Sequence, residues 1–215
     1  MIIAIAHQKG GCSKTTLALN LLIALDGDQG FDLDAAKGGT TGLSFLAAIR
    51  QKYKHSKINV VPIINNDELS KVIESDSDDL IMIMDLGGLD SDINRVALAY
   101  ADLVITPASD SMLEIGGLVE FSRMLDEISI QTNQEIKAHI IAARTNPSRK
   151  KWMALNDICS KYSNLIFADI AMPLYVDYVD ASAQGLSVTE FNNDGKAAMY
   201  IHKIASYIKN ELKEN

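Results

Sequence analysis

Cysteine, proline and tryptophan are scarce in this sequence, with two, four and one of them among 215 residues. The two cysteines, Cys12 and Cys159, are too few for a disulfide framework, which predicts a chain kept in a reducing, cytoplasmic compartment. With so few prolines and no stretch rich in Pro, Ser or Gly, nothing in the sequence marks a linker. A chain of this length can bury one sizeable core. We therefore expect a single domain spanning residues 1–215.

Long apolar runs are missing as well. No run approaches the roughly 20 residues that a membrane-spanning helix needs, and Met1 leads directly into "IIAIA" without the basic lead and cleavage pattern of an export signal. Positive charge is also in deficit, since 20 Lys and Arg face 28 Asp and Glu and the net charge is −8. This balance argues against a protein that coats itself in nucleic acid, although a local basic patch can still bind it.

What the sequence does contain is a repeated succession of short apolar runs and longer amphipathic stretches. The apolar runs are continuous rather than alternating, which is typical of strands buried on both faces. They predict strands at 2–6, 58–64, 80–84, 102–106, 138–143 and 165–170. The amphipathic stretches predict helices at 14–25, 41–54, 67–74, 91–100, 113–128, 149–162 and 194–212. This succession predicts an α/β fold with a mostly parallel, doubly wound sheet flanked by helices, and ligands beyond the carboxyl ends of the strands.

The first of these strand ends carries a phosphate-binding motif. The stretch "AIAHQKGGCSKTT" (4–16) runs from a predicted strand into a predicted helix, so backbone N–H groups and the helix N-terminus can point at an anion. Against the general pattern G-x-x-x-x-G-K-[ST], the lysine is Lys14 and the hydroxyl is Thr15. Gln8 and Ser13 occupy the two glycine positions. The general pattern therefore fails, and what remains is "KGGCSKTT".

This remaining stretch resembles the deviant loop K-G-G-x-G-K-[ST]-T of the ParA/MinD family of ATPases, most of all the ParA-type partition ATPases, with Ser13 as its one departure. In that family the first glycine position is commonly not glycine, so Gln8 is no objection. The segment "DLDAAKGGTTGL" (32–43) is similar to the family's switch segment, and "LIMIMDLGG" (80–88) to its strand ending in D-T-P-P-G. Two later segments, "YADLVITPASDSMLEIGGLVEF" and "YVDASAQGLSVTEF", are similar to family segments in the same order. The resemblance covers almost the whole chain and implies a P-loop NTPase fold.

The resemblance implies a site for ATP and Mg²⁺. Lys14 would lie over the β- and γ-phosphates, Thr15 would ligate Mg²⁺, and the hydroxyl of Thr16 would reach the α-phosphate. Lys9 would cross a dimer interface to touch the partner's nucleotide, which implies a sandwich homodimer formed with ATP. The implied phosphate-binding residues are Lys9, Gly10, Gly11, Cys12, Ser13, Lys14, Thr15 and Thr16.

Three aspartates complete the implied site. Asp34 matches the switch aspartate that orients or activates the attacking water, Asp32 would sit near the metal, and Asp85 would hold the water shell of the magnesium ion. Such second-shell carboxylates suit Mg²⁺, which usually keeps several of its waters. Because "LDGDQGF" (25–31) has no apolar run, Asp26 and Asp28 are alternatives for the motif. The "TTGL" that follows favours Asp34.

Two loop residues leave the chemistry open. Ser13 can keep the loop only if its backbone avoids a conformation reserved for glycine, where a Cβ would cost about 1 kcal/mol or more. We expect nucleotide binding to survive and hydrolysis to be slow and stimulated by a partner. Cys12 is expected to be a small filler residue. The alternative is an alkylation-sensitive thiol, because a position near a helix N-terminus tends to lower the pKa of a thiol.

The family's ATP cycle implies a partition function. The ATP-bound dimer would bind nonspecific double-stranded DNA, would be stimulated by a ParB-like partner on the cargo, and would be associated with the nucleoid in the cytoplasm. The densest basic cluster is "RTNPSRKKW" (144–152). Relatives read the base around the positions that match 144–147 and 172–173. The DNA-binding candidates are Arg149, Lys150, Lys151 and Lys203.

Two alternative functions follow from other features. One alternative is a MinD-like ATPase that cycles onto membranes, which needs a C-terminal amphipathic helix, or an ATPase that positions other cargo. The last segment has an apolar stripe that is more typical of a core helix, so we expect no membrane binding. The stripe consists of Ala198, Ile201, Ala205, Ile208 and Leu212. A weakly hydrolysing ATP-binding scaffold is the second alternative, motivated by Ser13 and by Ala35 and Ala36 in place of the family's Pro-Gln.

Overall fold

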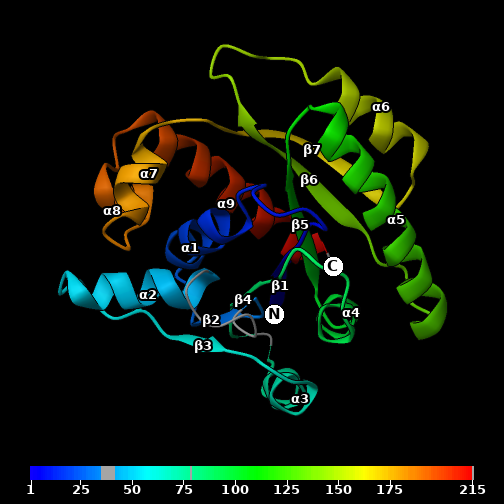
Figure 1. The fold of residues 1–215 in the computed structure, drawn as a ribbon, viewed down its shortest axis with the longest axis horizontal. Coiled ribbons are helices and arrows are strands. Elements are labelled where there is room, and N and C mark those ends of the chain that lie inside the picture. Colours follow the sequence, from blue (N-terminus) through cyan, green and yellow to red (C-terminus); the bar gives the residue numbers. More distant parts are fainter. Residues whose placement is uncertain (35–41, 78, 215) are drawn as a thin grey trace.

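The computed structural model describes residues 1–34, 42–77 and 79–214. Its strands form one parallel seven-stranded sheet with the order β3-β2-β4-β1-β5-β6-β7. The strands are β1 (Ile2–Ile5), β2 (Gln29–Asp32), β3 (Val60–Pro62), β4 (Met82–Asp85), β5 (Leu103–Ala108), β6 (Ala138–Thr145) and β7 (Leu165–Pro173). The sheet extends to both sides of β1, so the winding direction changes there (Figure 1). The predicted doubly wound α/β fold is confirmed.

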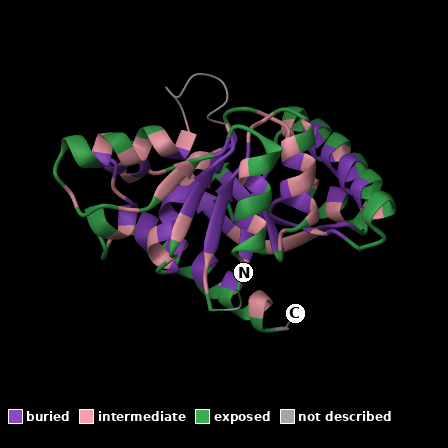
Figure 2. Cartoon of the chain, turned by 90° about the horizontal axis from the view of Figure 1, so that it is seen from below, coloured by how far each residue is buried: buried purple, intermediate pink, exposed green. Residues whose placement is uncertain are grey.

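Helices cover both faces of the sheet (Figure 1). On one face lie α1 (Lys14–Ala24), α2 (Gly42–Lys52), α7 (Asp177–Ser182), α8 (Val188–Phe191) and α9 (Lys196–Glu214). On the other lie α3 (Asn66–Glu74), α4 (Asp92–Ala99), α5 (Met112–Thr132) and α6 (Met153–Lys161). Figure 2 shows the buried strands between these two exposed helical layers.

The central strand β1 shows why its sequence is uninterruptedly apolar. Ile2 and Ala4 pack into the core under α3 to α6, whereas Ile3 and Ile5 pack into the core under α1 and α9. Successive strand side chains point to opposite faces, so a strand with helices on both faces has no position for a polar residue. This burial fixes the end of β1, and therefore the start of the phosphate loop, in the middle of the sheet.

The predicted strands and helices are all found, with shifted boundaries, but three elements were missed. Strand β2 (Gln29–Asp32) forms without an apolar run, because it is paired on both sides, with β3 and with β4. Its Gly30 lies so close to the Leu43 side chain that a Cβ would come within 2.9 Å of it. The short helices α7 and α8 were also missed. The structure does not describe residue 41, which is the first residue of one predicted helix. Ala35 and Ala36, which replace the family's Pro-Gln, also lie outside the described residues.

The apolar stripe of the last helix belongs to the core. Four members of the stripe considered for membrane contact are buried in α9, and Leu212 is partly buried against the same cluster. The buried members are Ala198, Ile201, Ala205 and Ile208. Among the helices of the described residues, none has the length and apolar character that crossing a bilayer requires.

Candidate functional site

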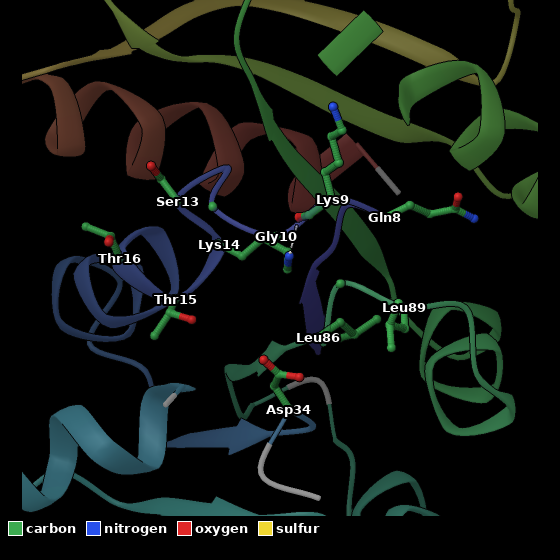
Figure 3. A pocket seen from close by; sticks show the side chains of 12 residues that line it. Gln8, Lys9, Gly10, Ser13, Lys14, Thr15, Thr16, Asp34, Leu86 and Leu89 are labelled. Carbon is green, nitrogen blue, oxygen red and sulfur yellow. Dashed lines mark hydrogen bonds between the residues drawn. The ribbon is translucent and has the colours of Figure 1, made fainter. Parts of the chain in front are cut away.

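The phosphate loop lies between β1 and α1, at the carboxyl edge of the sheet. It borders a cleft of about 620 Å³ that is lined by residues 8–11 and 13–16, by Asp34, and by Leu86, Gly88 and Leu89 from the segment after β4. Figure 3 shows the Thr15 hydroxyl and the Asp34 carboxylate turned toward the space between them. The structure thus gathers most of the predicted phosphate-binding residues around one cavity.

Lys14 begins α1, and its side chain is buried beneath the loop. Its ammonium Nζ donates a hydrogen bond to the Lys9 carbonyl over 2.9 Å and lies 3.8 Å from the Cys12 sulfur. A buried charge must be paired or hydrogen-bonded to be tolerated. Here the partners are a neutral carbonyl and a sulfur, so the ammonium keeps its positive charge available for an anion in the cleft.

Ser13 does not meet the condition set by the sequence. Its backbone has φ 78° and ψ 21°, in the left-handed region, and its side chain makes no cap hydrogen bond at the start of α1. A Cβ in this conformation costs about 1–2 kcal/mol. Gly11 has the same kind of backbone, with φ 77°, but carries no such cost. The loop therefore adopts a conformation that suits glycine at both positions and has serine at one.

Two buried aspartates stand side by side beyond the loop. Asp32 and Asp85 are directly paired residues of β2 and β4. The carboxylate of Asp32 accepts from the backbone N–H groups of Asp34 and Ser44, over 3.1 and 2.8 Å. A Cβ on Gly42 would lie 2.6 Å from the same carboxylate, so α2 can begin there only with glycine. Asp32 thus joins the backbone of Asp34 to the start of α2.

Asp85 has no hydrogen-bond partner for either side-chain oxygen among the residues that the structure describes, although both oxygens are buried. Burial, with the neighbouring Asp32 and Asp34, raises the pKa of Asp85 to about 7, although the Thr15 side chain and the Lys14 cation act to lower it. An unsatisfied buried carboxylate is costly, and such exceptions in native structures often mark a missing ion or water. The oxygens of Asp85 and the hydroxyl of Thr15 fit a hydrated Mg²⁺, which prefers oxygen ligands.

The segment after β4 lies directly against this site. A Cβ on Gly88 would lie 3.2 Å from the backbone nitrogen of Gly10, and one on Gly87 would lie 2.9 Å from a carboxylate oxygen of Asp34. A side chain at either position would force a neighbour to shift. The sequence showed these two glycines within "LIMIMDLGG", but their role depends on contacts between distant segments and could not be assigned from the pattern.

His7 was also missed as a residue of the site. Its Nδ1 accepts the backbone N–H of Lys9 over 2.9 Å, and its ring stacks on Phe121 of α5 with 6.5 Å between ring centroids. Burial, together with the Lys14 cation, lowers the pKa of His7 to about 4. The imidazole is therefore neutral at pH 7, and its Nδ1 holds the backbone of Lys9 at the start of the loop.

Lys9 lines the cleft, and Figure 3 shows its side chain turned away from Thr15 and Asp34. Its ammonium donates to the Leu113 carbonyl of α5 over 2.8 Å. The neighbouring Met112 and Leu113 side chains are each 77% exposed, and Leu89 is exposed as well. The ammonium of Lys9 therefore lies at the edge of the cleft, near exposed apolar side chains of α5.

Cys12 is buried, and burial raises the pKa of its thiol. Its sulfur contacts the Lys9 carbonyl over 3.2 Å. The alternative of a thiol with a lowered pKa is therefore wrong, because removal from water outweighs the nearby Lys14 cation. Cys12 fills space within the loop.

A second, smaller cavity of about 180 Å³ adjoins the loop at Ser13 and Thr16. Most of its remaining lining is apolar or aromatic and comes from the end of β7 and from α7, with Arg144 at the end of β6. Among these residues are Met172, Pro173, Tyr175 and Tyr178. Arg144, Met172 and Pro173 belong to the two segments whose counterparts read the base in relatives.

The basic side chains considered for DNA lie on two separate elements. Arg149 is engaged by Asp110, whereas Lys150 and Lys151 are exposed in the segment between β6 and α6. Lys203 lies on α9, with Nζ 5.5 Å from the centroid of the Tyr200 ring. No described contact joins Lys203 to the basic cluster, so a shared DNA surface stays a prediction.

A phosphate loop between the first parallel strand and a helix N-terminus, with a buried aspartate at the end of a neighbouring strand, defines a P-loop NTPase fold. No protein-family model and no curated protein matches the sequence. Solved structures do: ligand-free McdA from Cyanothece superposes with a TM-score of 0.73 at 15% identity, over 97% of this chain and 99% of that chain. MinD from Aquifex aeolicus gives 0.72 at 16% identity, over 97% of each chain.

A ParA family ATPase from Chlorobium tepidum gives a TM-score of 0.67 at 15% identity, over 95% of this chain and 97% of that chain. This chain therefore has the fold of the ParA/MinD ATPases, and the predicted resemblance is confirmed at the level of the fold. Two similar structures hold nucleotides. Cyanothece McdA in complex with ATP has a TM-score of 0.70 at 14% identity, over 97% of this chain and 96% of that one. MinD from Pyrococcus horikoshii with Mg-ADP has a TM-score of 0.66 at 14% identity, over 96% and 95%.

Proposed function

We propose that the chain is a Mg²⁺-dependent ATPase of the ParA/MinD type. The observation that carries this proposal is that Lys14, Thr15 and Asp34 line one cleft, with the buried carboxylate of Asp85 beside Thr15 and Lys14. Phosphoryl transfer needs charge neutralisation and positioning more than covalent help, and these residues supply both. The nucleotide-bound structures of Cyanothece McdA and of P. horikoshii MinD support the choice of ligand.

Each part of the loop has a role in this proposal. Backbone N–H groups of residues 10–16 donate to the phosphates, and Lys14 exchanges the Lys9 carbonyl for phosphate oxygens. The Thr16 hydroxyl reaches the phosphate nearest the second cavity, whose aromatic walls take the base. Asp34 orients the attacking water. When bound, Mg²⁺ supplies positive charge to the phosphates, held by the Thr15 hydroxyl and, through water, by Asp85 and Asp32.

The ATP-bound form is proposed to be a homodimer. The Leu113 carbonyl holds the Lys9 ammonium at the edge of its own cleft, on the α5 side, where its charge can reach a nucleotide in a second copy of the chain. The exposed Met112, Leu113 and Leu89 give that interface apolar area close to the nucleotide. ATP would then complete the interface, and hydrolysis would release it.

For the biological role, we propose DNA partition. The ATP-bound dimer would bind nonspecific double-stranded DNA through Lys150, Lys151 and Lys203, with Arg149 contributing once it is released from Asp110. A ParB-like partner on the cargo would stimulate hydrolysis. Because the acidic remainder of the chain repels the phosphate backbone, DNA contact is expected only at these basic side chains.

The test is fluorescence anisotropy of a random-sequence labelled duplex, titrated with protein in Mg²⁺ and ATP, ADP or no nucleotide. DNA binding seen only with ATP, lost in Lys14→Ala and weakened in the double variant Lys150→Glu with Lys151→Glu, supports partition. Lys71→Glu, an exposed charge reversal on α3, is the matched control. Absence of DNA binding in every nucleotide state, while ATP still binds, contradicts the partition role and favours a membrane-cycling or other cargo-positioning ATPase.

Hydrolysis distinguishes an ATPase from an ATP-binding scaffold. Phosphate release that is measurable in the wild type and abolished in Asp34→Ala supports an enzyme. ATP binding with no phosphate release above the Asp34→Ala background would favour the scaffold.

A further inference from the structure

Arg144 makes a contact with the phosphate loop that the ATPase chemistry described above does not use. Its Nη1 donates a hydrogen bond of 2.6 Å to the carbonyl of Gly11. Its backbone has φ 54°, in the left-handed region, at a register irregularity between β6 and β7. Such a conformation in a residue other than glycine persists only where the surroundings hold it. The end of β6 is thus shaped to bring this guanidinium onto the loop.

The contact fixes the orientation of one peptide group. In a planar trans peptide the carbonyl and the next N–H point in opposite directions. Arg144 lines the smaller cavity and not the phosphate cleft, so it holds the Gly11 carbonyl toward that cavity. The N–H of Cys12 is thereby directed to the other side of the loop. A peptide free to flip would offer a carbonyl where an anion needs a donor.

The same contact lies two residues from the strained position. Ser13 holds a left-handed backbone without a side-chain cap hydrogen bond. Relaxing Ser13 would rotate the adjoining peptides, and the hydrogen bond to Gly11 opposes this rotation. The carboxylate of Glu114, 3.9 Å from the same nitrogen of Arg144, helps to keep the guanidinium in place.

We propose that Arg144 is a positioning residue that holds the Ser13-containing loop in its phosphate-binding conformation. The serine at position 13 creates the need for it, and a glycine there would remove most of that need. The proposal rests on the nucleotide-binding function proposed above, and it predicts a specific energetic coupling between Arg144 and Ser13.

The test is a double-mutant cycle on the full chain with Arg144→Met, Ser13→Gly and both together, read as the Kd for a fluorescent ATP analogue in Mg²⁺. Arg144→Met is expected to weaken binding by about five- to tenfold, as loss of one solvent-exposed hydrogen bond would. In the Ser13→Gly background the same change is expected to weaken it less than about twofold. Coupled sites are recognised by this non-additivity. Arg123→Met, an exposed arginine of α5, is the matched control and should leave the Kd unchanged.

Equal weakening by Arg144→Met in both backgrounds would overturn the proposal, because Arg144 would then act on the nucleotide directly. The proposal would also be overturned if Arg144→Met did not weaken nucleotide binding in the chain that keeps Ser13. Hydrogen exchange of the nucleotide-free protein gives a readout that needs no ATP. Arg144→Met should speed exchange of the amides of residues 10–14, and Ser13→Gly should restore their protection. If the wild type does not bind ATP, the proposed function is refuted but the role of Arg144 is not. The role of Arg144 is refuted if Arg144→Met leaves the hydrogen exchange of residues 10–14 unchanged.

Discussion

Replacing Ser13 by glycine should stabilise the protein, although it removes atoms from a folded structure. The left-handed backbone of Ser13 costs about 1–2 kcal/mol in strain. Glycine removes that strain but loses about 0.4–1 kcal/mol through the greater freedom of the unfolded chain. The serine hydroxyl makes no cap hydrogen bond, so nothing else is lost. The net gain in the free energy of unfolding is about 0.5–1 kcal/mol.

The assay is thermal and urea unfolding of the nucleotide-free protein. For a domain of this size, 1 kcal/mol shifts the Tm by about 2–4 °C, so Ser13→Gly should raise it by about 1–4 °C. Ser13→Ala is the matched control: it also lacks the hydroxyl but keeps the Cβ, and should give no such gain. An unchanged or lowered Tm for Ser13→Gly would refute the reasoning, because position 13 would then not hold a strained left-handed conformation.

Four further predictions concern polar and ionisable side chains. Arg50 is buried and paired with Glu190 over 2.5 Å, so Arg50→Met should cost about 3–5 kcal/mol in urea unfolding; a loss below 1 kcal/mol would contradict this. Burial opposes ionisation of Glu190, but its hydrogen bond with Arg50 holds the pKa of Glu190 below its usual value. The free energy of unfolding should therefore decrease as pH falls below about 4. In Glu190→Gln this decrease should be smaller. The pKa of Asp85 is raised to about 7, so in the absence of Mg²⁺ the free energy of unfolding should decrease as pH rises from about 4 to 7. If the free energy of unfolding of Asp85→Asn decreased equally over this pH range, Asp85 would be excluded as the cause. Because burial raises the pKa of the Cys12 thiol, iodoacetamide should label it only on unfolding, and rapid labelling of the native protein at pH 8 would disprove this.

Most of the sheet could be predicted because its strands are buried on both faces. Uninterrupted apolar runs such as 2–6 leave few alternatives. Strand β2 escaped prediction because its Gly30 and Asp32 break the apolar pattern, and only pairing with β3 and β4 makes it a strand. Helices α7 and α8 are too short for a 3.6-residue periodicity to be recognised.

The candidate site was predictable where chemistry depends on residue type and order, as for Lys14 and Thr15. It was not predictable where it depends on distant contacts. Arg144 belongs to a basic cluster in sequence, yet its guanidinium lies on the loop. Cys12 stands beside a helix N-terminus, yet burial decides its pKa. Whether Ser13 is strained depends on a backbone angle that no residue pattern encodes.

Calorimetric titration of ATP with Mg²⁺ tests the central claim, that this cleft binds a nucleotide through its lysine and buried carboxylate. The predicted result is one saturable site per chain in the wild type, lost in Lys14→Ala, retained in the exposed control Lys161→Ala, and weakened when Mg²⁺ is chelated. Unchanged binding in Lys14→Ala, or no binding by the wild type, would contradict it.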